Sequence, residues 1–286
     1  MRCTLISQAL CSLALAMAVA GCGGTDDDGG GGGEEQKPPP VTDGNWYRPP
    51  ITATWQWQLQ GNLNTSYDVD IYDIDLFDTD AADIAALQAD GRRVLCYFSA
   101  GSYEDWRPDA GSFDASDLGN TLSGFEDERW LDIRSSNVLD IMYARLDLAV
   151  QKGCDGVEPD NVTGYEEDTG FDLTATDQLA FNRQLFNAAH ERDLAVALKN
   201  DLEQIAQLID YVDLMINEEC HEFDECGTLQ PFIDAGRPVL NAEYLAAYRD
   251  APETVCPRAL DGNLRTLILD PELDDSFRFS CDDDFQ

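Results

Sequence analysis

Histidine and positive charge are both scarce in this sequence. Its 286 residues include 2 His, and 18 Lys and Arg stand against 56 Asp and Glu, a formal net charge of −38. Such a chain repels nucleic acids and anionic lipids, so those partners are disfavoured. His190 falls in a helical pattern and His221 in a loop, which disfavours a zinc site and a Ser-His-Asp triad.

Other signatures are missing as well. No glycine-rich phosphate loop follows a predicted strand, and no EF-hand spacing or internal repeat is present. We therefore expect no cofactor, no resident metal ion and a monomer. The simplest interpretation of the acidic balance is solubility or adaptation to salt; the alternative is attraction of cations or of a polycationic substrate.

The first residues have the pattern of an export signal. Arg2 precedes a largely apolar run from Ala9 to Ala20 that is too short to span a bilayer, and Val19-Ala20-Gly21-Cys22 resembles a bacterial lipobox. The pattern predicts a lipoprotein signal over residues 1–21, lipidation of Cys22, and an exported, membrane-anchored protein in the periplasm or at the cell surface. The alternative is an ordinary secretory signal with a chance cysteine.

A linker is expected after the lipidated cysteine. Residues 22–44 contain five consecutive glycines, three consecutive prolines and several acids, with little apolar surface to bury. Such a segment is typical of a disordered tether. We expect the folded part to be a single domain over residues 45–286.

Cysteine usage agrees with export. Of nine cysteines, Cys3 and Cys11 fall in the signal and Cys22 is the lipid site, so six remain for the domain. An even number in an exported protein indicates disulfides. The spacing suggests three pairings, although Cys96 and Cys154 can also remain buried thiols: Cys220 with Cys226, Cys256 with Cys281, and Cys96 with Cys154.

Strand and helix patterns alternate along the domain. Strand patterns occupy eight segments: 54–59, 69–77, 93–98, 153–161, 194–200, 213–220, 238–244 and 264–269. Helical patterns occupy 81–89, 135–150, a segment from Thr176, 202–208 and 229–235. Alternation of this kind predicts parallel βαβ units, and eight units form a closed (β/α)₈ TIM barrel of the α/β class. An open doubly wound sheet is the alternative.

The stretch from Gly153 to Asn161 has the pattern of a barrel strand that ends in acid. Side chains alternate along a strand, so Val157 is expected on one face and Glu158 and Asp160 on the other. Carboxylates inside a barrel, near the C-terminal end of a strand, indicate catalysis. The alternative is a plain strand followed by an acidic turn, because Asp and Asn are common turn residues.

Polar residues recur at the ends of the other predicted strands, where a barrel brings them to one mouth. They are Asp75, Tyr97, Ser99, Lys199, Asn200, Asn217, Glu218, Glu243 and Tyr244. Carboxylates, amides, aromatics and a single lysine suit a carbohydrate, and glycosidic cleavage uses two carboxyl groups. Any one of these acids has an alternative role as a helix cap or a cation ligand.

Six ordered segments together resemble glycoside hydrolase family 114. They are residues 74–78 (IDLFD), 94–104 (VLCYFSAGSYE), 130–134 (WLDIR), 153–161 (GCDGVEPDN), 198–200 (LKN) and 217–220 (NEEC). The resemblance covers roughly Trp55 to Tyr244 and implies a (β/α)₈ endo-α-1,4-polygalactosaminidase. One departure is Glu158, where the family has Asp; the exchange keeps the charge.

The resemblance also implies a set of site residues. The catalytic pair falls on Asp160 as nucleophile and Glu218 as acid/base, with Glu219 as the competing choice. Trp57 is expected to stack on a sugar ring, and the remaining candidates to shape the sugar subsites unless they only fill the barrel: Asp75, Tyr97, Asn161, Lys199 and Glu243. A retaining and an inverting mechanism both stay open.

The expected function is that of a lipid-anchored hydrolase of an α-1,4-linked, galactosamine-containing polysaccharide. If the polymer is partly deacetylated it is cationic, and an acidic cleft would hold it. The main alternative is a non-catalytic carbohydrate-binding barrel at the cell surface. A hydrolase of another sugar is the third.

Overall fold

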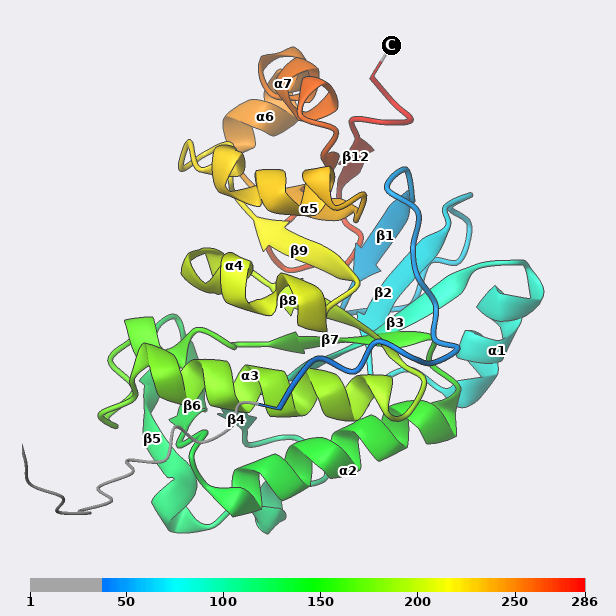
Figure 1. Cartoon of the computed structure of the whole chain (residues 1–286). Helices are drawn as coiled ribbons and strands as arrows, with labels where there is room; N and C mark the ends of the chain where they lie inside the picture. Colours follow the sequence, from blue (N-terminus) through cyan, green and yellow to red (C-terminus); the bar gives the residue numbers. More distant parts are fainter. Residues whose placement is uncertain (1–37, 286) are drawn as a thin grey trace, which may run out of the picture. The chain divides into compact units, whose positions relative to one another are not determined.

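The computed structural model describes residues 38–285 and has the predicted (β/α)₈ TIM barrel architecture (Figure 1). Eight neighbouring strands are parallel. They are β1 (Trp55–Gln58), β2 (Ile71–Asp75), β3 (Arg93–Ser99), β7 (Gly156–Asp160), β8 (Ala195–Lys199), β9 (Leu214–Glu218), β10 (Val239–Glu243) and β11 (Arg265–Leu269). Seven of them fall within the segments that the sequence pattern predicted, and β3 extends one residue beyond its segment, to Ser99.

Side chains and a ninth strand join the two ends of the sheet. β12 (Arg278–Ser280) pairs antiparallel with β11, and Arg278 donates to the backbone oxygen of Trp55. The Trp55 indole in turn donates to the backbone oxygen of Arg265 over 2.8 Å. Within residues 38–285 no backbone ladder runs directly from β1 to β11. Hydrogen bonds from side chains therefore bridge this seam.

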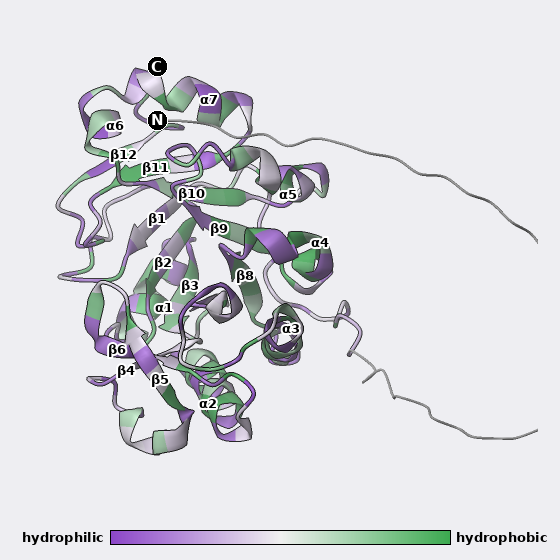
Figure 2. Ribbon diagram, turned by 90° about the vertical axis from the view of Figure 1, so that its left-hand side faces the viewer, coloured by the Kyte–Doolittle hydropathy of each residue, from purple (hydrophilic) through white to green (hydrophobic). Residues whose placement is uncertain are grey.

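Alternation along the strands separates two apolar layers. Leu95, Ala197, Ile216 and Leu240 belong to the cluster inside the barrel. Their strand neighbours, such as Val94 and Leu198, belong to the larger cluster between strands and helices. Because both faces of a barrel strand are buried, the strands are apolar on both sides; Figure 2 shows this as hydrophobic colour in the strands.

Helices cover the outside of the strands. Helices α2 (Ser136–Lys152) and α3 (Ala175–His190) pack side by side, and α4 (Ile205–Leu208) and α5 (Gln230–Asp234) follow them around β8 and β9 (Figures 1 and 2). The others are α1 (Ala81–Ala89), α6 (Ala246–Asp250) and α7 (Cys256–Asp261). The sequence did not predict α6 and α7, which are short; Pro252 lies between them and Pro257 lies in the first turn of α7.

Two capping features explain where the long helices begin and end. The Thr174 hydroxyl accepts from the backbone of Asp177, whose carboxylate accepts from the backbone of Thr174, and this capping box starts α3. Gly153 ends α2 with φ of +88°, a conformation that glycine adopts without steric cost.

An antiparallel sheet is inserted between β3 and α2. It consists of β4 (Ser102–Glu104), β5 (Leu118–Leu122) and β6 (Phe125–Leu131) in the order β4-β6-β5. The sequence did not predict it, because β4 has only 3 residues and the Phe125–Arg129 segment is strongly charged, which is unusual for a strand. We call these three strands the insert.

The packed part of the chain begins before the predicted boundary at residue 45. The Tyr211 hydroxyl donates to the backbone oxygen of Pro38, and the Asn187 amide donates to that of Pro39. Trp46 stacks on His190 with ring centres 4.1 Å apart. Residues 38–44, which the composition assigned to the linker, therefore lie against the barrel. The predicted signal peptide, Cys22 and the start of the linker lie outside the described residues.

Three disulfides form with the suggested pairings. Cys220 bonds Cys226, Cys256 bonds Cys281, and Cys96 bonds Cys154. The last pair resolves the alternative of buried thiols. Among residues 38–285, no helix is both long enough and apolar enough to cross a membrane.

Candidate active site

A cavity of about 750 Å³ opens at the C-terminal ends of the barrel strands. Asp160, Lys199 and Glu218 line it, each the last residue of its strand. The ladder between β7 and β8 ends at Val157 and Val196, so it does not tie Asp160 to Lys199. Pro159 contributes no N–H that would extend the pairing there. The two strand tips are thus free to present side chains to the cavity.

Lys199 lies between the two predicted catalytic acids. Its Nζ is 3.1 Å from Asp160 Oδ1 and 3.1 Å from Glu218 Oε2. Burial opposes a charge at this position, but the carboxylates of Asp160, Glu218 and Glu158 outweigh it and raise the pKa of the ammonium group well above its ordinary value. Lys199 is therefore cationic, and its ammonium group contacts the carboxylates of both acids.

Asp160 is fixed by hydrogen bonds on both carboxylate oxygens. Oδ1 accepts from the Asn161 backbone over 2.7 Å, and Oδ2 accepts from the Tyr97 hydroxyl over 3.3 Å. Burial and the charge of Asp160 raise the pKa of Tyr97 well above its ordinary value, so the phenol keeps its proton and donates. Tyr97 thus orients Asp160 from within the cavity wall.

Glu218 has a similarly complete set of partners. Oε1 accepts from Tyr244 over 2.6 Å and Oε2 from the Asn200 amide over 3.2 Å. Burial alone raises the pKa of Glu218, but the Lys199 charge together with the Tyr244 and Asn200 hydrogen bonds lowers it below its ordinary value. Glu219 also lines the cavity, yet Glu218 is the residue that contacts Lys199.

A residue with a left-handed backbone conformation directly follows each of the three strands that end in Asp160, Lys199 and Glu218. Asn161, Asn200 and Glu219 have φ of 58°, 50° and 60°. Asn tolerates this region better than most residues, whereas Glu rarely adopts it. Each turn ends a strand directly after its functional side chain, so that the side chain points into the cavity while the backbone leaves it.

Asn161 also links β7 to the insert. Its amide donates to Ser99 Oγ over 2.8 Å and to Ser102 Oγ over 3.3 Å. Ser102 Oγ in turn donates to Glu128 Oε2 over 2.6 Å. Gly101 makes this approach feasible, because a Cβ there would lie 1.8 Å from the backbone oxygen of Asn161.

Two predicted sugar-binding residues support other side chains instead. Asp75 lines the cavity, but its carboxylate forms a bidentate ion pair with Arg107 at 3.0 and 2.7 Å. Trp57 also lines the cavity but is only 1% exposed, and the Lys199 ammonium lies over its ring, 5.0 Å from the ring centre. Asp75 thus fixes the wall, and Trp57 forms the floor under Lys199.

Glu243 does not reach the cavity. It is fully buried, and it accepts from the His221 backbone and the Asn241 amide. Its strand neighbours Ala242 and Tyr244 pack with the barrel interior, so alternation turns Glu243 to the outer layer. Tyr244 occupies the place by the cavity that the sequence assigned to Glu243.

The insert and the loop after β4 build one wall of the cavity. Arg107 pairs with Glu104 at 2.7 Å as well as with Asp75, so its charge is neutralised locally. Trp106 and Phe125 line the same wall and are 53% and 58% exposed. Exposed aromatic faces beside a polar cavity are suited to stacking on a ligand ring. Neither residue ends a barrel strand, so the pattern of polar residues at strand ends did not single them out.

The acidic lining dominates the charge of the cavity. Eight of its lining residues are acids and two are basic. The acids are Asp75, Asp78, Glu104, Glu128, Asp160, Glu218, Glu219 and Glu272. Ion pairs with Asp75 and Glu104 neutralise the charge of Arg107. Among the described lining residues, Lys199 is then the one whose positive charge offsets the remaining acids, so the cavity attracts cations.

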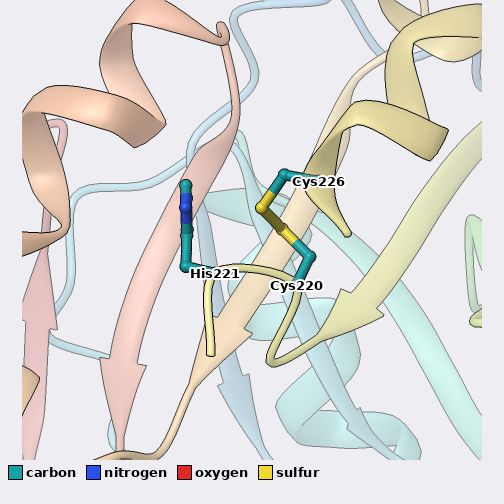
Figure 3. A group of neighbouring side chains, drawn as sticks. All are labelled: Cys220, His221 and Cys226. Atoms are coloured by element: carbon teal, nitrogen blue, oxygen red, sulfur yellow. A yellow bond between two sulfur atoms is a disulfide. The ribbon is translucent and has the colours of Figure 1, made fainter. Parts of the chain in front are cut away.

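Another group of side chains brings sulfur and imidazole together behind β9. Ligand atoms of Cys220, His221 and Cys226 lie within 4.8 Å of one another (Figure 3). The two sulfurs are joined in a disulfide and so are not thiolates, the form in which cysteine binds metal. This group therefore ties down the loop that follows Glu218 and Glu219.

Comparison with known proteins identifies the scaffold. A sequence model described as glycoside-hydrolase family GH114 matches residues 36–286. The chain belongs to glycoside-hydrolase family GH114. It is 43% identical to Ega3 of Aspergillus fumigatus, solved in complex with galactosamine, with a TM-score of 0.80 over 84% of this chain and 99% of that one. No match was found among curated proteins.

A more distant relative has the same fold. The glycoside hydrolase domain of PelA from Pseudomonas aeruginosa is 16% identical, with a TM-score of 0.65 over 81% of this chain and 99% of that one. This GH114 chain is thus a glycoside hydrolase on a TIM barrel. Its cavity lies at the barrel end where such enzymes carry their active sites.

Proposed function

We propose that this protein is an endo-acting hydrolase of α-1,4-linked, galactosamine-containing polysaccharide, with Asp160 as nucleophile and Glu218 as general acid/base. The observation that carries the proposal is the contact of both carboxylates with one ammonium group, at 3.1 Å each. Glycosidic cleavage needs two carboxyl groups on either side of one bond, and the cavity offers this pair at its centre.

The geometry supports a retaining mechanism. Because Asp160 Oδ1 and Glu218 Oε2 both lie 3.1 Å from Lys199 Nζ, these two oxygens cannot be more than about 6.2 Å apart. Retaining enzymes place their carboxyl groups about 5–5.5 Å apart, and inverting enzymes about 6.5–9.5 Å apart to admit a water. Asp160 would attack the anomeric carbon while Glu218 gives a proton to the departing glycosidic oxygen; water, losing a proton to Glu218, would then attack the same carbon and release the sugar from Asp160.

The roles within the pair depend on where the proton lies. The lowered pKa of Glu218 favours its ionised form, whereas a general acid must hold a proton before the bond breaks. Glu218 meets this requirement when substrate separates its carboxylate from Lys199. Azide tests the assignment. If Asp160 is the nucleophile, Asp160→Asn with azide should yield a glycosyl azide whose anomeric configuration is inverted relative to the substrate. A glycosyl azide of retained configuration would instead show that Asp160 is the acid/base and Glu218 the nucleophile.

The substrate class follows from the charge of the cavity and from the relative. Eight acidic residues face two basic ones, and Ega3 was solved with galactosamine. A deacetylated galactosamine unit carries an ammonium group that these acids attract, and Trp106 and Phe125 offer faces for its ring. Added salt should weaken cleavage of the cationic polymer. Activity that does not change with ionic strength would contradict electrostatic attraction.

The deciding experiment combines cleavage with matched variants. Purified protein is incubated with partly deacetylated galactosaminogalactan, and released fragments are measured by mass spectrometry. Asp160→Asn and Glu218→Gln should each lower the rate by about 10³-fold or more, while Glu222→Gln, an exposed acid outside the cavity, should not. If the wild type binds the polymer but does not cleave it, the proposed activity is wrong and the protein is a carbohydrate-binding barrel.

We also propose that the protein is exported and held on a membrane by lipid on Cys22. The support is the sequence alone: Arg2, the apolar run and the lipobox-like Val19–Cys22. Expression in a bacterium with labelled palmitate should label the wild type but not Cys22→Ser. Release of unlabelled wild-type protein into the soluble fraction would contradict the anchor.

A further inference from the structure

Two buried acids lie below Asp160 and Glu218 in the barrel, and their carboxyl oxygens lack well-formed hydrogen bonds. Asp73 on β2 and Glu158 on β7 are both fully buried inside the barrel. Their carboxyl groups are within hydrogen-bonding reach of each other. Among the described residues, no well-formed hydrogen bond reaches any of their four oxygens; the Ile74 backbone N–H is near Asp73, and the Lys199 ammonium lies 3.4 Å from Glu158 Oε1. Two acceptors thus face each other in a place that water does not reach.

A single proton resolves this arrangement. Buried polar atoms normally have a partner, and two carboxylates in contact cannot both be ionised. A proton on one carboxyl supplies the missing donor, as in the acid pairs of aspartic proteases. Burial, followed by the neighbouring charge of Asp73, raises the pKa of Glu158 well above its ordinary value; burial raises that of Asp73 to about 7.

The pair contacts the catalytic centre through Lys199. Glu158 Oε1 lies 3.4 Å from Lys199 Nζ, the same atom that contacts Asp160 and Glu218. These three residues are the charged groups that face Glu158, besides Asp73. Tyr97 and Tyr244 also lie near Glu158 and stay neutral, because burial raises the pKa of both phenols well above the ordinary value. Lys199 is thus the link between the pair and the catalytic acids.

We propose that Asp73 and Glu158 share one proton at about pH 8 and act as a singly charged positioning unit that holds the Lys199 ammonium between Asp160 and Glu218. The inference rests on the proposed function for its kinetic consequence, but not for the proton itself. If both carboxyl groups of the pair were ionised, their charge would attract the Lys199 ammonium away from Asp160 and Glu218. If both were protonated, only Asp160 and Glu218 would attract it.

Infrared spectroscopy detects the shared proton directly. At about pH 8, Glu128 and Asp201, whose pKa values are both raised to about 7, are largely ionised. The wild type should still show the C=O stretch of a buried carboxylic acid. Asp73→Asn and Glu158→Gln should each abolish this band. Absence of the band from the wild type overturns the proposal, and so does its persistence in either variant.

The pH dependence of cleavage tests the positioning role. Each single variant replaces the shared proton with an amide donor and so keeps one negative charge on the pair. The midpoints of its pH–rate profile should therefore stay within about 0.3 unit of the wild type. The double variant Asp73→Asn/Glu158→Gln carries no charge there, so both limbs should move to lower pH by about one unit.

Three outcomes separate the proposal from its competitors. If a single variant moves both limbs about half as far as the double variant does, the pair is fully ionised in the wild type and the inference is wrong. Unmoved limbs in a folded double variant would show that the pair does not act on the catalytic acids. If the wild type cleaves no polymer but shows the infrared changes, the shared proton stands and the proposed function fails.

Discussion

The Tyr244 hydroxyl donates to Glu218 Oε1 over 2.6 Å, which is the shortest of the hydrogen bonds that Glu218 receives. A bond to the ionised carboxylate favours that form, and so it is one reason why the pKa of Glu218 is lowered. The bond runs from the residue that follows β10 to the last residue of β9, so the register of these two neighbouring strands affects the pKa of a proposed catalytic group.

Removing this hydroxyl should therefore make Glu218 a weaker acid. In Tyr244→Phe we expect the pKa of Glu218 to rise, which moves the basic limb of the pH–rate profile upward by about 0.5–1 unit. Cleavage rates of the polymer across pH measure this. Tyr143→Phe, on α2 and outside the cavity, is the matched control. A downward shift of the basic limb would contradict the role of Tyr244.

Lys199→Met should lower both activity and stability. The substitution leaves Asp160 and Glu218 without their shared cation, and breaking a buried ion pair costs about 3–5 kcal/mol. Burial raises the pKa of Glu218 and the Lys199 charge lowers it, so without Lys199 the folded-state pKa of Glu218 should rise above its unfolded value. Glu218 then favours folding at low pH and loses that contribution as pH rises through the folded pKa.

The resulting stability difference should depend on pH. Denaturant unfolding should show the largest deficit of Lys199→Met relative to wild type near pH 8 and a smaller one near pH 5. Lys152→Met is the control, because Lys152 donates only to backbone oxygens. A deficit that does not change with pH would mean that the loss is one of packing and not of charge.

Trp106 should contribute to polymer binding and not to bond cleavage. Trp106→Ala removes an exposed ring from the cavity wall, and an aromatic contact with a cationic sugar contributes about 1–2 kcal/mol. We expect KM for the polymer to rise about 5–30-fold while kcat stays within about twofold. Phe223→Ala removes an aromatic that is 63% exposed but lies outside the cavity, and should change neither.

The three disulfides should differ in their contribution to stability. In the chain-entropy model a longer loop constrains the unfolded state more, so Cys96–Cys154, with a separation of 58 residues, contributes about 4 kcal/mol. Cys220–Cys226, separated by 6 residues, contributes about 2 kcal/mol. Double Cys→Ala variants measured by denaturant unfolding test this order. Equal losses would favour an enthalpic origin.

The strand pattern predicted much of the site because the barrel converts chain order into spatial order. Asp160, Lys199 and Glu218 each end an apolar run, and the C-terminal ends of parallel strands meet at one mouth. That rule places them together without any knowledge of side-chain contacts. It also favoured Glu243, which ends its strand in the same way.

Its position at the end of a strand does not tell whether a side chain points into the barrel or toward the outer helices. Barrel strands are apolar on both sides, so the alternation that separates Glu243 from Tyr244 cannot be read from hydrophobicity. The insert was missed for a different reason. Its charged strand pairs across a tight turn, where cross-strand contacts outweigh a weak β-propensity.

The sequence by itself determined the barrel, the order of its strands and the acids at their ends, because periodicity and turn chemistry are local properties of the chain. Only the tertiary structure decided that one ammonium group, on Lys199, would serve Asp160, Glu218 and Glu158 at once. Burial and distance set the charge state of each acid, and both depend on residues far away in the chain.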